Sequence, residues 1–156
     1  MNVRYFALVL GIIFLLVGVM GFIPAFVTHP MDMTGARDAG PHAAHGNLIG
    51  LFPVNTLHSL VHLLFGLWGV LAYRTFDGSR VYARSVAVIY GILTIMGLIA
   101  AANVYNTFGW IPLHGNDVWL HAVVAIAAAY FGFAPAREPL RERDLATDTG
   151  VRDDVV

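Results

Sequence analysis

Cysteine and lysine are absent from the 156-residue chain, and charged residues of any kind are scarce. Without cysteine the protein has no disulfide, no thiolate metal ligand and no thiol chemistry. Charged residues make up 12% of the sequence, against roughly a quarter of an ordinary soluble domain. The formal net charge is −1, and no basic patch is interleaved with aromatic residues, so we expect no nucleic-acid partner.

The motifs of common enzyme classes are also missing. The sequence has no nucleophile elbow, no glycine-rich phosphate loop, no H-E-x-x-H motif and no paired carboxylates within an apolar stretch. Hydrolysis or phosphoryl transfer would therefore lack its usual groups. An enzyme is the less favoured interpretation.

Apolar residues are abundant and make up 58% of the chain. A membrane-spanning helix needs about 20 mostly apolar residues, and four stretches meet this requirement, at 5–27, 54–73, 81–103 and 118–134. They predict an all-α fold, a four-helix transmembrane bundle that forms one domain over residues 1–136. The first stretch is longer than the apolar core of a signal peptide and lacks an A-x-A-like cleavage site, so we expect it to remain as a helix.

The segments outside the predicted helices have their own signals. Residues 28–53 form the longest loop, irregular at first and apolar enough at 48–53 to dip back into the membrane interface. Pro53 suits the first turn of the second helix, where its missing N–H costs nothing. Asp77-Gly78 predicts the turn of a tight loop at 74–80. Residues 137–156 are charged and poor in apolar side chains, which predicts a disordered tail.

The basic residues indicate the orientation in the membrane. Eight of the nine arginines flank the predicted spans on one side, and Arg37 is the exception. Because basic residues concentrate in cytoplasmic loops, both termini are predicted to be cytoplasmic. The eight are Arg4, Arg74, Arg80, Arg84, Arg137, Arg141, Arg143 and Arg152. All seven histidines then fall on the outer side, namely His29, His42, His45, His58, His62, His114 and His121.

Small and polar residues share helical stripes in three of the predicted spans. Small residues let helices approach closely in a membrane, so we expect the stripes to face the bundle interior and the larger apolar residues to face lipid. The first span contributes Gly11, Gly18 and Gly21, the second Asn55, His58, His62, Gly66, Gly69 and Tyr73, and the fourth Asp117, His121, Ala125, Ala128 and Gly132.

Three histidines are predicted to share one layer just below the outer surface. His58 and His62 lie one helical turn apart in the second span, and His121 lies about 6 Å below Asp117 in the fourth. Ionisable residues inside spans are rare and tend to mark functional sites. The leading hypothesis is a non-enzymatic zinc or copper site formed by His58, His62 and His121. Asp117 is expected to be a fourth ligand or a hydrogen-bond acceptor that orients an imidazole.

The surroundings of this site leave other roles open. Asn55, Asp117, Asn103, Tyr105 and Asn106 are expected to ring its opening. The histidines could instead only stabilise the bundle, by hydrogen bonds to Asn103, Tyr105, Tyr90 or backbone carbonyls. In that case the protein would be an accessory subunit of a larger membrane complex, or would form a homo-oligomer. Haem or another tetrapyrrole held between helices, and a proton relay, are further alternatives.

The outer loop carries a weaker signal. His29, Met31, Met33, His42 and His45 offer imidazole and thioether groups without thiolate, a combination that suits copper. A polar loop with incidental histidines explains the same residues.

Two segments resemble the motifs of a known family. The stretch from Leu51 to Gly66 carries the letters FPVN followed by two histidines four residues apart, and the stretch from Gly115 to His121 reads GNDVWLH. Both resemble DUF4383, a family of small bacterial four-span membrane proteins of unknown function. The resemblance extends from the first helix to about residue 133, and it departs from the family pattern at Ser59 and in the close spacing of Asn116 and Asp117. It implies a multi-pass protein of the bacterial inner membrane and draws attention to Asn55, His58, His62, Asp117 and His121, but it implies no activity.

Overall fold

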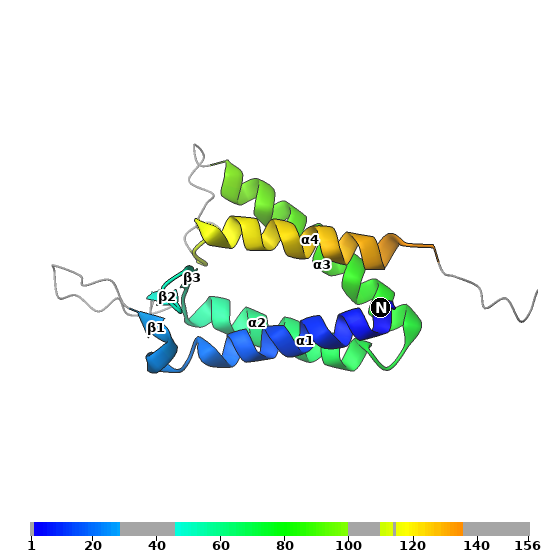
Figure 1. The fold of residues 1–156 in the computed structure, drawn as a ribbon, viewed down its shortest axis with the longest axis horizontal. Coiled ribbons are helices and arrows are strands. Elements are labelled where there is room, and N and C mark those ends of the chain that lie inside the picture. The colour runs from blue at the N-terminus through cyan, green and yellow to red at the C-terminus, as the bar shows by residue number, and fades with distance from the viewer. Residues whose placement is uncertain (1, 29–45, 100–109, 114, 136–156) are drawn as a thin grey trace, which may run out of the picture.

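A computed structural model describes residues 2–28, 46–99, 110–113 and 115–135. It is mostly helical, as predicted, with four α-helices and a small sheet (Figure 1). In chain order the elements are α1 (Val3–Met20), the 3-10 helix η1 (Pro24–Phe26), β1 (Val27–Thr28), β2 (Gly46–Leu48), β3 (Phe52–Val54), α2 (Thr56–Ala72), α3 (Phe76–Leu98) and α4 (Asn116–Phe133). The expected disordered tail and the methionine-bearing part of the outer loop lie outside the described residues.

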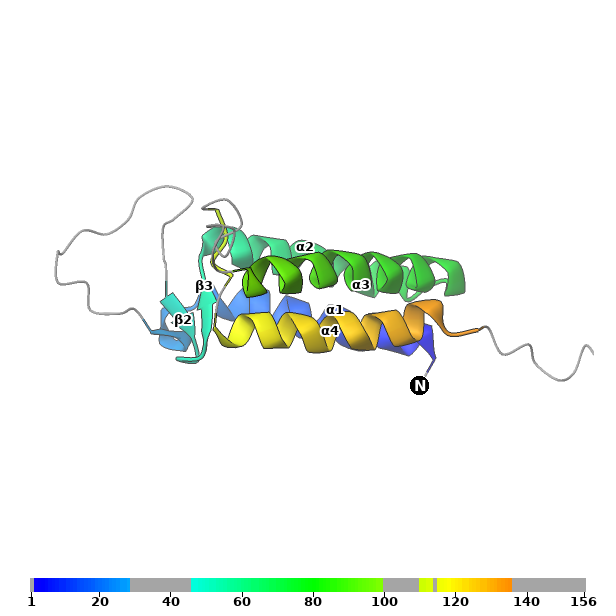
Figure 2. The same ribbon diagram turned by 90° about the horizontal axis from the view of Figure 1, so that it is seen from above.

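The helices form two antiparallel pairs, since α1 packs most extensively on α2, and α3 on α4. Figure 2 shows α2 beside α3 in one layer and α1 beside α4 in the other, with the sheet at one end of the bundle. The larger hydrophobic core lies where the pairs meet, around Phe6, Phe14, Tyr82, Val86 and Tyr90. This arrangement confirms the predicted four-helix fold.

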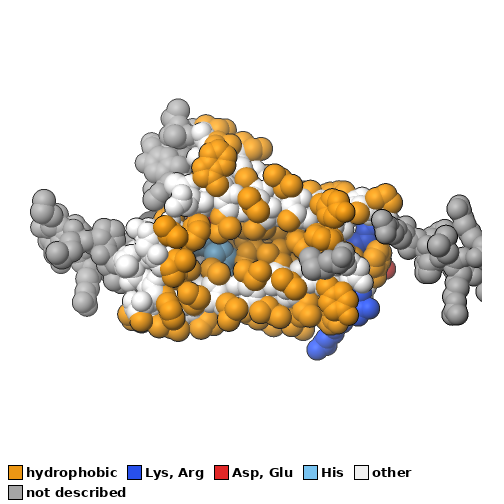
Figure 3. All heavy atoms as spheres, in the orientation of Figure 1, with side chains coloured by type: hydrophobic (Ala, Val, Ile, Leu, Met, Phe, Trp, Pro, Cys, Tyr) orange, Lys and Arg blue, Asp and Glu red, His pale blue; other side chains and the backbone are white. Residues whose placement is uncertain are grey.

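Three of the helices, α1, α3 and α4, are long and apolar enough to cross a membrane, while α2 is slightly shorter at 17 residues. Their outward faces are apolar, as the orange surface in Figure 3 shows. Leu64, Val123 and Ile126, for example, are 66%, 64% and 72% exposed. Apolar faces of this extent suit a hydrocarbon solvent and would be unfavourable in water. The exposed leucine, isoleucine and valine side chains are therefore on the face predicted to contact lipid.

The first helix ends at Met20, not near residue 27 as the hydropathy predicted. The cause is Pro24, which has no N–H to donate to the Met20 carbonyl and whose ring would clash with it in an α-helix. Ile23 donates to that carbonyl instead, at 3.1 Å, and Pro24 opens the 3-10 helix η1. Phe22 and Ile23 lie between α1 and η1, and residues 24–27 belong to η1 and β1.

The apolar segment before α2 forms strands, which the sequence did not predict. The strand order is β1-β2-β3 and the pairing is antiparallel, with Leu48 opposite both Val27 and Phe52. The chain reverses between β2 and β3 through positive φ angles at Ile49 and Gly50, as tight hairpin turns require. Pro53 accordingly lies in β3 opposite Asn47 and not in the first turn of α2.

The connection between α2 and α3 is shorter than predicted. Asp77 and Gly78 lie in the first turn of α3 and do not form a separate turn. Thr75 begins this helix, because its side chain accepts a hydrogen bond from the Gly78 N–H at 3.1 Å. The carboxylate of Asp77 also suits the positive end of the helix dipole.

The described arginines lie at the end of the bundle opposite the sheet, where blue side chains appear in Figure 3. Two of them satisfy carbonyl groups that helix ends leave unpaired. Arg4 Nε donates to the Tyr73 carbonyl after α2, and Arg84 Nε donates to the Gly132 carbonyl in the last turn of α4, both at 2.9 Å. The same guanidinium groups lie over the rings of Tyr73 and Phe133.

The predicted glycine stripes form the contact between α1 and α2. A β-carbon added at Gly66 would lie 2.7 Å from the backbone nitrogen of Leu15 and 2.8 Å from the carbonyl oxygen of Gly11. One added at Gly11 would meet the backbone of Val70 at 2.8 Å. The two backbones therefore touch directly, which is the role that small residues have between membrane helices.

Substitution of Gly66 by alanine is expected to destabilise the protein by about 1–3 kcal/mol, because the backbone of α1 has to move away from the new methyl group. The measurement is the thermal unfolding temperature, Tm, of the purified protein in detergent. Gly91→Ala in α3 is the matched control, since nothing lies within 4 Å of its added β-carbon. Equal Tm values for the two variants would contradict the close packing of α1 on α2.

Candidate metal centre

Asn55 determines where α2 begins and ties it to the segment before α4. Its side-chain oxygen accepts a hydrogen bond from the His58 N–H at 2.8 Å, which makes Asn55 the N-cap of α2. Its side-chain nitrogen donates to the carbonyl of Trp110 at 2.7 Å. The residue is 1% exposed. Both ends of the amide of Asn55, predicted to ring the site opening, are therefore used in a buried structural link.

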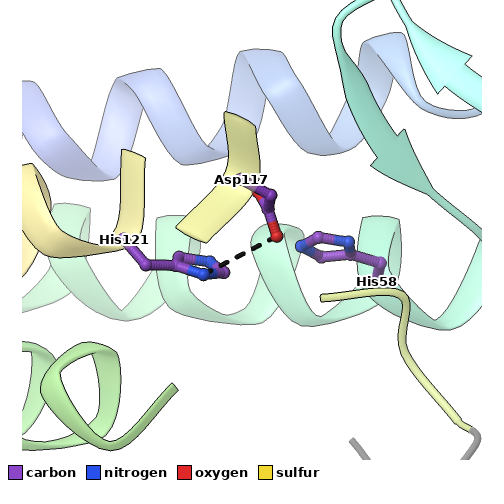
Figure 4. A group of neighbouring side chains, drawn as sticks. All are labelled: His58, Asp117 and His121. Carbon is purple, nitrogen blue, oxygen red and sulfur yellow. Dashed lines mark ion pairs between the residues drawn. The ribbon is translucent and has the colours of Figure 1, made fainter. Parts of the chain in front are cut away.

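Three side chains converge from α2 and α4 (Figure 4). His58 comes from the first turn of α2, while Asp117 and His121 lie one turn apart on α4. One potential ligand atom from each of the three lies within 4.8 Å of the others. Asp117 Oδ2 and His121 Nδ1 are 3.6 Å apart. All three residues are at least 96% buried, which places a carboxylate and two imidazoles in the interior.

Several polar atoms of this cluster have no hydrogen-bond partner among the described residues. They are Nδ1 of His58, Oδ2 of Asp117 and Nδ1 of His121. The separation of 3.6 Å between the last two atoms is longer than a hydrogen bond. An unpaired buried polar group costs about 1–3 kcal/mol, and more if it is charged. Unpaired buried atoms of this kind are expected only where something else satisfies them.

His62 lies beside this cluster but outside the group of three. Its ring is stacked on Phe14 of α1, with centroids 5.4 Å apart and planes 7° from parallel. The ring centroid of His58 is 4.5 Å away. The predicted proximity of the two histidines is therefore present, but the side chains that gather most closely are His58, Asp117 and His121. Tyr90, a predicted hydrogen-bond partner, makes an edge-to-face ring contact with His121 at 4.7 Å.

A cavity of about 60 Å³ adjoins the cluster between the helix pairs. Three histidines and Tyr90 contribute to its wall, and the remaining side chains are apolar. A histidine is visible between the apolar side chains in Figure 3. The full lining is His58, Val61, His62, Phe65, Ile89, Tyr90, Leu93, Ile111, Leu113 and His121.

Some predicted site residues lie outside the part of the chain that the structure describes. Asn103, Tyr105 and Asn106 of the expected opening lie outside the described residues. The same holds for the outer-loop group of His29, Met31, Met33, His42 and His45, and for His114.

Sequence analysis missed two features of the site. The first is the link from Asn55 to Trp110, for which a signal was present, since an asparagine before an apolar helical run is typical of an N-cap. The second is the packing of His62 on Phe14, for which the sequence offers no signal, because the pairing depends on how α1 lies against α2.

Apolar helices that enclose a buried polar cluster define a protein of the helical membrane class. Comparison with known families agrees with the resemblance that the sequence motifs of this chain suggested. The chain belongs to the family described as Domain of unknown function (DUF4383), whose model matches residues 4–134. No curated protein and no solved structure matches the chain. The matched region contains all four helices and the cluster of His58, Asp117 and His121.

Replacing Asn55 with alanine is expected to destabilise the protein more than replacing Asn2 with alanine. Both are helix N-caps, and loss of a cap alone costs about 0.5–2 kcal/mol. Asn55→Ala also leaves the Trp110 carbonyl without its donor. The Tm of each variant measures the difference, and equal losses would show that the link to Trp110 contributes nothing.

Proposed function

We propose that this protein is a multi-pass membrane protein that binds a divalent transition-metal ion through His58, Asp117 and His121. The supporting observation is the convergence of three buried ligand-type side chains, among which Asp117 Oδ2 and His121 Nδ1 lie 3.6 Å apart without a hydrogen bond. The ion would satisfy all three at once, and it would join α2 to α4 across the boundary between the two helix pairs.

The spacing of the atoms suits an ion between them. In a tetrahedral site with ligand bonds of about 2.0–2.1 Å, neighbouring ligand atoms are about 3.4 Å apart. The distance of 3.6 Å between Asp117 Oδ2 and His121 Nδ1 is close to that value. The other ligand atoms lie within 4.8 Å of one another, so binding would draw the side chains together by up to about 1.4 Å.

The chemistry of the ligands favours zinc or copper, because neutral imidazole suits both and a carboxylate lowers the charge of the site. The pair of histidines with one carboxylate also resembles the ligand set of non-haem iron(II) sites. His62 has a separate role in this proposal, as the stacked side chain that packs the cluster against α1.

Other interpretations have less support. A haem needs a pocket on the order of 300–1,000 Å³, whereas the cavity beside these histidines measures about 60 Å³. A purely structural role for the cluster, as in an accessory subunit, would predict hydrogen bonds among its members, and in the described part of the chain none joins the side chains of His58, Asp117 and His121.

Metal analysis of the full-length protein in mild detergent tests the proposal. We expect zinc, copper or iron near one ion per chain by ICP-MS. We expect His58→Phe and His121→Phe each to weaken binding roughly 100-fold or more, because even loss of a residue that only orients a ligand costs 10–100-fold. His62→Phe is the matched control, since a phenyl ring keeps the stacking on Phe14 and His62 is not one of the proposed ligands. Failure of the wild type to bind any of the three metals would refute the proposal, and loss of binding in His62→Phe alone would assign the site to other residues.

The orientation is part of the same proposal. The arginine-rich end is assigned to the cytoplasm and the sheet to the outer side of the bacterial inner membrane, because basic residues concentrate on the cytoplasmic side. The 17 residues of α2 extend about 25 Å, and β3 and Asn55 lengthen its path toward the outer surface.

Single-cysteine labelling measures this orientation directly, since the chain has no native cysteine. Leu51, in the turn between β2 and β3, and Asp77, at the start of α3, are both exposed. In intact spheroplasts, a membrane-impermeant maleimide is expected to label Leu51→Cys, and to label Asp77→Cys only after lysis. The reverse pattern would invert the assignment, and labelling of both in intact spheroplasts would exclude a span formed by α2.

A further inference from the structure

We propose that the cavity beside the cluster holds a small monovalent anion that is the fourth ligand of the metal ion. This inference rests on the proposed function. None of the three protein ligands fills the fourth coordination position of the ion, and the cavity restricts the charge and the size of the group that can.

The position of the cavity is the first argument. Both His58 and His121 line it, so two of the three proposed ligands lie at its wall. Asp117 contributes to the cluster but not to the cavity lining. An ion held among the three residues would therefore have protein ligands on one side and the cavity on the other. Three protein ligands with one open position are typical of metal sites that take an exogenous ligand.

Charge balance is the second argument. A divalent ion with two neutral imidazoles and the Asp117 carboxylate has a net charge of +1. The described arginines contact carbonyls and rings at the other end of the bundle, and they do not approach the cavity lining. Isolated charge in an apolar interior is strongly unfavourable. One monovalent anion brings the site to neutrality, whereas a divalent anion would leave a net negative charge.

The size and the walls of the cavity are the third argument. One water needs about 10–15 Å³ of such space, so a cavity of about 60 Å³ has room for a group of a few heavy atoms. Val61, Leu93, Ile111 and Leu113 supply no hydrogen-bond donors to it, and apart from the proposed ligands only His62 and Tyr90 bring polar side-chain atoms to the wall. Oxyanions such as phosphate and sulfate need several donors, so the walls favour a halide, hydroxide or a linear ion such as azide.

Cobalt(II) spectroscopy of the full-length protein in detergent tests the inference, since tetrahedral cobalt absorbs in the visible region and its bands change with each ligand. Azide is the probe. We expect a saturable spectral change with azide and with thiocyanate, and none with sulfate or with benzoate, which is too large. Leu93→Phe, which fills the cavity, is expected to bind cobalt as the wild type does and to weaken azide binding at least tenfold. Ile95→Phe is the matched control, because Ile95 lies on the same helix and is 59% exposed. This variant is expected to bind azide as the wild type does.

The outcomes separate this inference from the proposed function. Cobalt binding with no response of the wild type to azide overturns the anion site alone. Val61→Phe is the second variant that fills the cavity. Azide binding as tight as that of the wild type in both Leu93→Phe and Val61→Phe places the anion elsewhere and also overturns the inference. Absence of cobalt binding, together with absence of zinc, copper and iron, overturns both proposals.

Discussion

The direct contact of the α1 and α2 backbones at Gly11 and Gly66 is the constraint on which the other features of the bundle depend. In hydrocarbon, apolar side chains gain little by leaving lipid for protein, so association relies on van der Waals contact and on hydrogen bonds. Close approach also determines the rotation of α2 about its axis. Gly66 and Gly69 are turned toward α1 and Tyr82. His62 and His58 lie one and two turns earlier on the same stripe of α2, so they have to point into the bundle.

The second helix pair completes the environment of these histidines. Asp117 and His121 occupy the inward face of α4, and Ala128 and Gly132 continue that face toward the arginine end. Within each pair the packing is intimate, whereas the cavity and the polar cluster both lie between the pairs. The polar cluster and the cavity therefore both lie at the boundary between the two pairs, which a bound ion would bridge.

The sequence was sufficient to predict the parts of the fold that depend on composition and periodicity. Four apolar stretches became four helices, and the inward stripes of α2 and α4 followed from the spacing of their small and polar residues. Hydropathy failed at Val27, because an average over a window cannot distinguish an apolar strand from an apolar helix. Leu48, predicted to lie in a loop that dips into the interface, also belongs to a strand. Hydropathy also failed at Phe76, where the side chain of Thr75, and not apolar character, determines where α3 begins.

The candidate site was predictable only in part, for a similar reason. Helical spacing indicated that His58 and His62 share a face and that Asp117 and His121 share another. Which of the four meet across the bundle depends on the height of α2 relative to α4, and that height depends on tertiary links such as the one from Asn55 to Trp110. The structure places Asp117 between the two histidines, whereas the sequence had suggested either a fourth ligand or an acceptor that orients an imidazole.

The arginines at the other end of the bundle have a consequence for how the chain reaches its final state. In the proposed orientation, Arg4 and Arg84 would direct insertion, and in the fold the same guanidinium groups donate hydrogen bonds to the carbonyls of Tyr73 and Gly132. Each of these two contacts joins segments from different helices, so it can form only when both helices have inserted with the same ends on the arginine side. A helix inserted the wrong way round would leave its arginine without that carbonyl. The tertiary hydrogen bonds would therefore stabilise the same topology that the membrane favours.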